Sequence, residues 1–106
     1  MSRQLFYNGH VYRDHRFETL CVLSENGVIT EIGEWISAPE AERIDLKGRR
    51  LVPGFLDIHT HGAAGVDVNS ADPDGYEKIS RFMASQGTTG WLGSAHRYEG
   101  ADTGLY

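Results

Sequence analysis

Two histidines separated by one residue are the side chains in this sequence best suited to chemistry. His59 and His61 stand at positions i and i+2, and side chains alternate along a β-strand, so both imidazoles leave the strand on the same face. Their Cα atoms then lie about 7 Å apart, which lets both rings reach one divalent ion. Neutral imidazole suits zinc, iron and similar metals. We therefore predict that His59 and His61 are metal ligands.

Asp57 shares that face of the strand and comes one step before His59. From there its carboxylate can accept a hydrogen bond from a ring N–H, which would orient a ligand imidazole without touching the metal. A His-x-His pair also occurs at the solvated tip of a surface strand, and the spacing alone leaves that alternative open. An apolar strand before the pair and a glycine-rich loop after it, residues 62–69, favour the metal site.

Residues 55–60 are predicted as the strand that carries the pair. Its apolar side chains fall on both faces of the strand: Phe55, Leu56 and Ile58. Strands that are buried on both faces are typical of parallel α/β sheets. We therefore expect this strand to be buried on both faces in a parallel sheet.

A helix is predicted after the glycine-rich loop. Asp72 suits the N-cap and Pro73 the first helical position. The apolar residues that follow have helical spacing: Tyr76, Ile79, Phe82 and Met83. Gly87 is expected to cap the end of the helix, and residues 88–92 form the next predicted strand. The order strand, helix, strand predicts a βαβ unit with parallel pairing.

The first fifty residues are predicted to form a small antiparallel sheet without chemistry of its own. The expected strands are residues 5–7, 11–12, 17–23, 28–32, 44–46 and 51–52. Asn8-Gly9 and Asn26-Gly27 are pairs that favour positive φ angles, so each is expected to form a tight turn.

Composition excludes several classes of function. The 106 residues carry a formal net charge of -5 and have no basic block, which argues against a nucleic-acid surface. No segment resembles a signal peptide or a membrane span, so we expect a cytoplasmic protein. Cys21 is the only cysteine, which excludes a disulfide framework, and its neighbours Leu20 and Val22 favour a buried thiol on a strand.

The segment PGFLDIHTHG resembles the first barrel strand of the amidohydrolase superfamily. Its continuation is similar to the family of N-acetylglucosamine-6-phosphate deacetylases, with the same motifs in the same order: His61-Gly62, Gly65-Val66-Asp67, a helix, and Gly87-Thr88-Thr89-Gly90. Cyclic amidases share the His-x-His strand but often continue with an Arg, where this chain has Gly62-Ala63-Ala64-Gly65. The resemblance extends over nearly all of residues 3–92.

The resemblance implies a fold class and a division of the chain. The expected fold is α/β. Residues 1–52 would be the amino-terminal part of a small β-sandwich, and residues 53–92 the first βαβ unit of a (β/α)8 TIM-type barrel, incomplete in these residues. Residues 93–106 are expected to be an unaligned tail, because the family usually continues with a Pro-Thr step where Gly93-Ser94 stands. His96 in that tail is expected to be solvated rather than a ligand.

The resemblance also implies a reaction: hydrolysis of the acetamide of N-acetylglucosamine 6-phosphate to glucosamine 6-phosphate and acetate, with one or two divalent ions such as zinc or iron. No catalytic residue and no site for an organic cofactor is expected in this chain, since the family's catalytic Asp would lie beyond Tyr106. The parent enzyme is expected to be a homo-oligomer that acts on a small amino-sugar phosphate, with no nucleic acid or membrane as partner. Two alternatives stay open: another metal-dependent amidohydrolase (a cyclic amidase or an aminoacylase), and a non-catalytic truncated fragment that is inactive alone.

Overall fold

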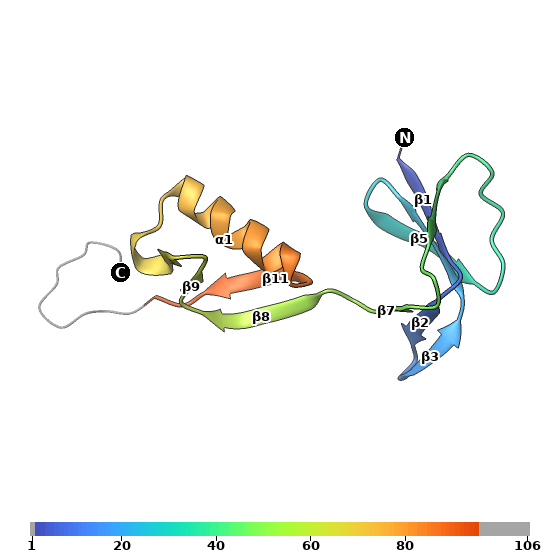
Figure 1. Cartoon of the computed structure of the whole chain (residues 1–106), viewed down its shortest axis with the longest axis horizontal. Helices are drawn as coiled ribbons and strands as arrows, with labels where there is room; N and C mark the ends of the chain where they lie inside the picture. Colours follow the sequence, from blue (N-terminus) through green and yellow to red (C-terminus); the bar gives the residue numbers. More distant parts are fainter. Residues whose placement is uncertain (1, 96–106) are drawn as a thin grey trace, which may run out of the picture. The chain divides into compact units, whose positions relative to one another are not determined.

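The computed structural model describes residues 2–95, which form strands, one α-helix and one short 3-10 helix. This confirms the predicted mixed α/β class, with strands as the main component. The chain divides into two units, Met1–Pro53 and Gly54–Tyr106. Figure 1 follows the chain through both of them.

The first unit holds two sheets. The larger has the strand order β5-β4-β1-β6 and is formed by β1 (Arg3–Tyr7), β4 (Cys21–Glu25), β5 (Val28–Gly33) and β6 (Glu42–Asp45). The smaller has the order β3-β2-β7 and is formed by β2 (His10–Arg13), β3 (Arg16–Thr19) and β7 (Arg50–Leu51). The prediction of a single antiparallel sheet is wrong, because β1 pairs with β6, and β2 with β7, in parallel.

The parallel pairs arise because two stretches of chain cross from the larger sheet to the smaller one side by side. One crossing is at Asn8-Gly9, and the other follows β6 and reaches β7. The two crossings are bonded to each other, with the N–H of Gly48 donating to the Asn8 carbonyl at 2.8 Å. Asn8 has a positive φ of 57°, but the prediction of a tight turn at Asn8-Gly9 is wrong, because β1 and β2 belong to different sheets and do not pair. A Cβ on Gly9 would lie 2.5 Å from Leu46 Cδ1, so the close approach requires glycine there.

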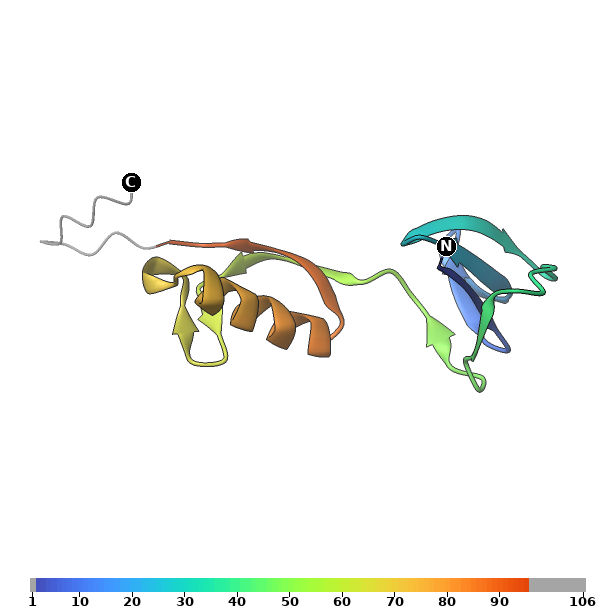
Figure 2. The same ribbon diagram turned by 90° about the horizontal axis from the view of Figure 1, so that it is seen from above.

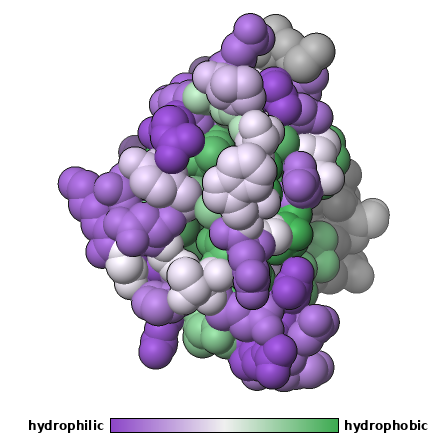
Figure 3. Space-filling view, turned by 90° about the vertical axis from the view of Figure 1, so that its right-hand side faces the viewer, coloured by the Kyte–Doolittle hydropathy of each residue, from purple (hydrophilic) through white to green (hydrophobic). Residues whose placement is uncertain are grey.

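Two small apolar clusters stabilise this unit. One joins the sheets and contains Val11, Leu20 and Val22 with Phe6 and Leu51 packed against it. The other lies beneath the segment that follows β5 and contains Leu5, Leu23, Ile36 and Ala38. Figure 3 shows one face of the molecule, on which apolar side chains gather in the middle and hydrophilic ones surround them.

The turns of this unit agree in part with the predictions. Asn26 (φ 52°) and Gly27 (φ 81°) connect β4 and β5 as an antiparallel hairpin, as predicted. A second hairpin joins β2 and β3 through Asp14 and His15, both with positive φ. That turn was missed because it contains no glycine or asparagine. The predicted strand over residues 17–23 is in fact two strands in different sheets, separated at the buried Leu20.

The second unit is a βαβ unit, as predicted. β8 (Phe55–Thr60) and β11 (Thr88–Gly93) pair in parallel, and α1 (Pro73–Ser85) connects them. Figures 1 and 2 both show α1 lying along this strand pair. The glycine-rich loop contains a small antiparallel pair, β9 (Gly62–Ala63) and β10 (Val66–Asp67), followed by the 3-10 helix η1 (Val68–Ser70).

Local sequence signals predicted both ends of α1 correctly. The Asp72 carboxylate caps the helix by accepting the N–H of Gly75 at 2.8 Å, and Pro73 takes the first position. Gln86 is the C-cap, and Gly87 follows it with φ 84°, the left-handed conformation that ends many helices. Of the predicted apolar face, Ile79 and Met83 are buried with Val68, whereas Tyr76 and Phe82 are exposed.

The prediction that β8 is buried on both faces is wrong for the described residues. Phe55, Leu56 and Ile58 are 63%, 75% and 76% exposed. The physical reason is that the part of the chain described here supplies one neighbouring strand and one helix, which cannot enclose both faces. Leu56 and Ile58 line an open apolar groove of about 340 Å³ together with Leu92.

Candidate metal centre

The predicted ligands lie together at the carboxyl end of β8. His59 belongs to the strand and His61 follows it directly, and both side chains are exposed. Their Nε2 atoms are 3.1 Å apart, and the ring centroids are 5.0 Å apart with an interplanar angle of 70°. The structure therefore turns the two imidazoles toward one point, as the i, i+2 spacing predicts.

The separation of the two nitrogens fits a shared metal ion. With metal–nitrogen bonds of about 2.0–2.1 Å, two ligands at the tetrahedral angle have nitrogens about 3.3 Å apart, and at a right angle about 2.9 Å. The observed 3.1 Å lies between these values. Within residues 2–95, no third His, Cys, Asp or Glu side chain completes a group that could hold an ion. The pair thus offers two of the three protein ligands that a catalytic zinc usually has.

A backbone carbonyl orients the second ring. His61 Nδ1 lies 2.9 Å from the carbonyl oxygen of Ser94, the residue that follows β11. The N–H of Ser94 in turn donates to the carbonyl of Thr60 at 2.7 Å, which continues the β8–β11 pairing past the end of the strand. The neighbouring strand therefore fixes which way the His61 ring faces.

Asp57 has a backbone donor. Its Oδ1 accepts the N–H of His59 at 3.0 Å, so the carboxylate supports the backbone on which the first ring stands. The expected hydrogen bond from a histidine ring N–H to the Asp57 carboxylate stays a prediction.

The loop after His61 is held closely against the site. The His61 carbonyl accepts the N–H of Val68 at 2.9 Å. Gly62 has φ 145°, and a Cβ there would lie 1.9 Å from the Val66 carbonyl oxygen, so the return of the loop leaves no room for a side chain. Thr60 is buried at the end of β8, and its hydroxyl bonds to the Gly62 backbone.

Sequence reasoning missed Ser94, because its contribution comes from backbone atoms that every residue has. It also missed Val68, although an apolar residue in a glycine-rich loop was a usable signal for packing. His96, expected to be solvated, lies outside the described residues.

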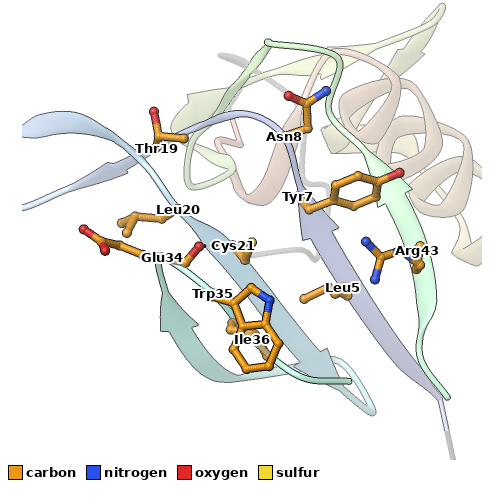
Figure 4. Close-up of a pocket in the computed structure, with 10 residues that line it drawn as sticks. All are labelled: Leu5, Tyr7, Asn8, Thr19, Leu20, Cys21, Glu34, Trp35, Ile36 and Arg43. Carbon is orange, nitrogen blue, oxygen red and sulfur yellow. Dashed lines mark hydrogen bonds between the residues drawn. The ribbon is translucent and has the colours of Figure 1, made fainter. Parts of the chain in front are cut away.

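A separate cavity of about 310 Å³ lies in the first unit. Figure 4 shows Trp35 and Ile36 on one side of it and Tyr7 with Arg43 on the other. The Arg43 guanidinium stacks over the Tyr7 ring at 4.5 Å. The half-buried Cys21 thiol also lines the cavity, 3.9 Å from the Glu34 carbonyl. With one carboxylate and no histidine in its lining, this cavity lacks the groups that a hydrolytic metal site needs.

The helix in the described part of the chain, α1, is too short and too polar to cross a membrane.

Known proteins match the chain on both sequence and structure. The sequence profile described as "Amidohydrolase family" matches residues 42–104, a range that includes most of the segment expected to be an unaligned tail. An N-acetylglucosamine-6-phosphate deacetylase of Lysinibacillus sphaericus is 32% identical over 77 residues, 73% of this chain and 20% of that protein. A dihydroorotase of Aquifex aeolicus is 55% identical over 40 residues, 38% of this chain and 10% of that protein.

Among solved structures, the N-acetylglucosamine-6-phosphate deacetylase from Pasteurella multocida superimposes with a TM-score of 0.78 and 26% sequence identity. The superposition includes 86% of this chain and 25% of that structure. The chain spans about a fifth of the length of the curated deacetylases it matches.

Proposed function

The chain belongs to the amidohydrolase family, and from that premise we propose that it supplies the first part of a metal-dependent amidase, with His59 and His61 as metal ligands. The observation that carries this proposal is the 3.1 Å separation of the two Nε2 atoms at the carboxyl end of β8. Barrel enzymes bind substrate at that end of their strands. We also propose that β8 and β11 are neighbouring strands of such a barrel, which the parallel pairing supports.

We propose hydrolysis of the acetamide of N-acetylglucosamine 6-phosphate as the reaction, giving glucosamine 6-phosphate and acetate. The similarity to deacetylases over 77 residues supports this substrate class. A divalent ion held by the two imidazoles would lower the pKa of a water molecule and polarise the amide carbonyl. The chain's own part is to aim the two rings: Ser94 orients His61, and Asp57 supports the backbone of His59. The remaining ligands and the Asp that moves the proton would come from residues outside these 106.

A second candidate is ring opening of a cyclic amide. The 55% identity to a dihydroorotase, over the 40 residues that match, favours it. Both reactions need a metal ion to activate water and polarise an amide carbonyl, so the histidine pair alone does not distinguish them. The homo-oligomer and the cytoplasmic location also stay proposals.

Metal binding is the first test of the proposal. Calorimetric titration of the 106-residue chain with Zn²⁺ should show one weak site. The site should be lost in His59→Ala and in His61→Ala. His10→Ala, which removes an exposed histidine from β2 in the first unit, is the matched control and should bind as the parent does. Equal binding by all four proteins would contradict the proposed ligands.

The choice between the two substrates is tested with the longer protein that carries this segment. Acetate release from N-acetylglucosamine 6-phosphate, with little release from unphosphorylated N-acetylglucosamine, would support the deacetylase. Turnover of dihydroorotate instead would support the cyclic amidase. The 106-residue chain alone should release no acetate above a His59→Ala control, since it offers two ligands where three are usual.

A further inference from the structure

The contact between His61 and Ser94 fixes the position of a proton. A carbonyl oxygen can only accept a hydrogen bond, so at 2.9 Å the proton must reside on His61 Nδ1. We infer that the Ser94 carbonyl is a positioning group that holds His61 as the Nδ1–H tautomer and leaves the Nε2 lone pair ready for a metal ion. The inference rests on the proposed metal site and names the residue that prepares it.

The two histidines are consequently not equivalent. With its proton on Nδ1, neutral His61 has an unprotonated Nε2. This nitrogen faces the Nε2 atom of His59 at 3.1 Å. Before a metal binds, the Nε2–H of His59 can donate to that lone pair. If Nε2 of His59 held a metal ion, that nitrogen would give its proton to solvent and Nδ1 would take one up, so that neutral His59 would carry its proton on Nδ1. Metal binding therefore changes the tautomer of His59 and leaves that of His61 as it was.

The carbonyl is held in place by the strand that precedes it. The N–H of Ser94 donates to the carbonyl of Thr60, whose side chain is buried. Gly93 lies close to the core of the second unit, where a Cβ would be 3.0 Å from Val68 Cγ1. These contacts fix the backbone that leads into the carbonyl, so its direction does not depend on the Ser94 side chain.

Two substitutions at one position separate the backbone from the side chain. Ser94→Ala keeps the N–H and the carbonyl, so it should leave His61 unchanged. Ser94→Pro removes the N–H that bonds to Thr60 and frees the carbonyl to move. Loss of a group that orients a metal-binding histidine typically costs about 10–100-fold in metal affinity. We expect a loss in that range for Ser94→Pro and none for Ser94→Ala.

The test is nitrogen NMR of the histidine rings in the ¹⁵N-labelled chain at pH 8, together with Zn²⁺ titration. The parent and Ser94→Ala should show His61 as the Nδ1–H tautomer, and His59 should change tautomer when Zn²⁺ is added. In Ser94→Pro, His61 should shift toward the Nε2–H tautomer and Zn²⁺ should bind more weakly. Backbone amide signals of α1 report whether the variant keeps its fold.

The outcomes are distinguishable. An Nε2–H tautomer for His61 in the parent would overturn the inference even if Ser94→Pro did not fold. Equal Zn²⁺ affinity in a folded Ser94→Pro would also overturn it. A parent with the Nδ1–H tautomer that binds no Zn²⁺ would instead contradict the proposed metal site and leave the orientation of the ring standing.

Discussion

The N–H of Val68 donates to the carbonyl of His61 at 2.9 Å, and this bond joins the candidate site to the core beneath α1. Val68 is buried against Ile79 and Met83, and Ile79 has no exposed surface. The position of His61 therefore depends on the packing of a helix that contributes none of the site's side chains.

Truncation of that core should weaken the site from a distance. Ile79→Ala should lower the free energy of unfolding of the second unit by about 2–5 kcal/mol, because the cavity it leaves is fully enclosed. Zn²⁺ affinity should fall as Val68 shifts. Urea denaturation and Zn²⁺ titration measure the two effects. Lys78→Ala, an exposed position on the same helix, should change neither.

Glycine should be required at position 62. Gly62→Ala places a methyl group against the Val66 carbonyl at a φ of 145°, so the β9–β10 pair must open and His61 must move. We expect loss of Zn²⁺ binding and a lower melting temperature. Gly65→Asn is the matched control in the same loop, because a Cβ there has open space and Asn tolerates its φ of 80°. A Gly62→Ala variant that binds Zn²⁺ like the parent would show that the loop is not so constrained.

Acid should remove a contribution of Asp45 to the stability of the first unit. The N–H of Lys47, and then the side-chain amide of Asn8, hold the pKa of Asp45 below its ordinary value of 3.8. A lowered pKa in the folded state means that the ionised carboxylate stabilises the fold above about pH 4, and that this stabilisation is lost as the pH falls through the folded-state pKa. Asp45→Asn should therefore be less stable than the parent at pH 6 by urea denaturation, and the gap should narrow as the pH is lowered below the ordinary pKa of 3.8. Glu40→Gln changes an exposed carboxylate that has no hydrogen-bond partner in the described part of the chain, and it should show no such gap.

The apolar groove of the second unit should make the 106-residue chain associate with itself. Leu56, Ile58 and Leu92 expose large apolar surfaces around it. Replacing Ile58 and Leu92 by Thr should reduce light scattering at a given concentration and leave the far-ultraviolet circular dichroism unchanged. Scattering that is the same in the parent and in the double variant would locate the association elsewhere.

The sequence predicted those parts of the fold that depend on neighbouring residues. Asp72 and Pro73 begin α1 through contacts within one helical turn, and Asn26-Gly27 closes a hairpin between adjacent strands. The closeness of the His59 and His61 rings followed from the alternation of side chains along one strand. Each of these signals is local, so the types of a few neighbouring residues were sufficient to predict the structure that they form.

The parts that the sequence did not predict depend on contacts between distant segments or on backbone groups that every residue has. The parallel pairing of β1 with β6 joins segments that no local pattern relates. Asp14 and His15 take positive φ angles as a pair without glycine or asparagine, and Asp and His also occur in many other conformations, so the turn had no clear signal. The role of Ser94 comes from its carbonyl, so its identity carried no information.

The crossing of two chain segments between the sheets of the first unit has a consequence for the order of folding. The β4–β5 hairpin closes over a short turn, but Gln4 meets Glu42 across 38 residues of chain. Such closures are slow, because the intervening chain must lose its freedom before the pairing stabilises it. During synthesis, β1 and β2 therefore leave the ribosome without their parallel neighbours. The larger sheet can be completed only after β6 has emerged. The smaller sheet must wait for β7, which ends at Leu51.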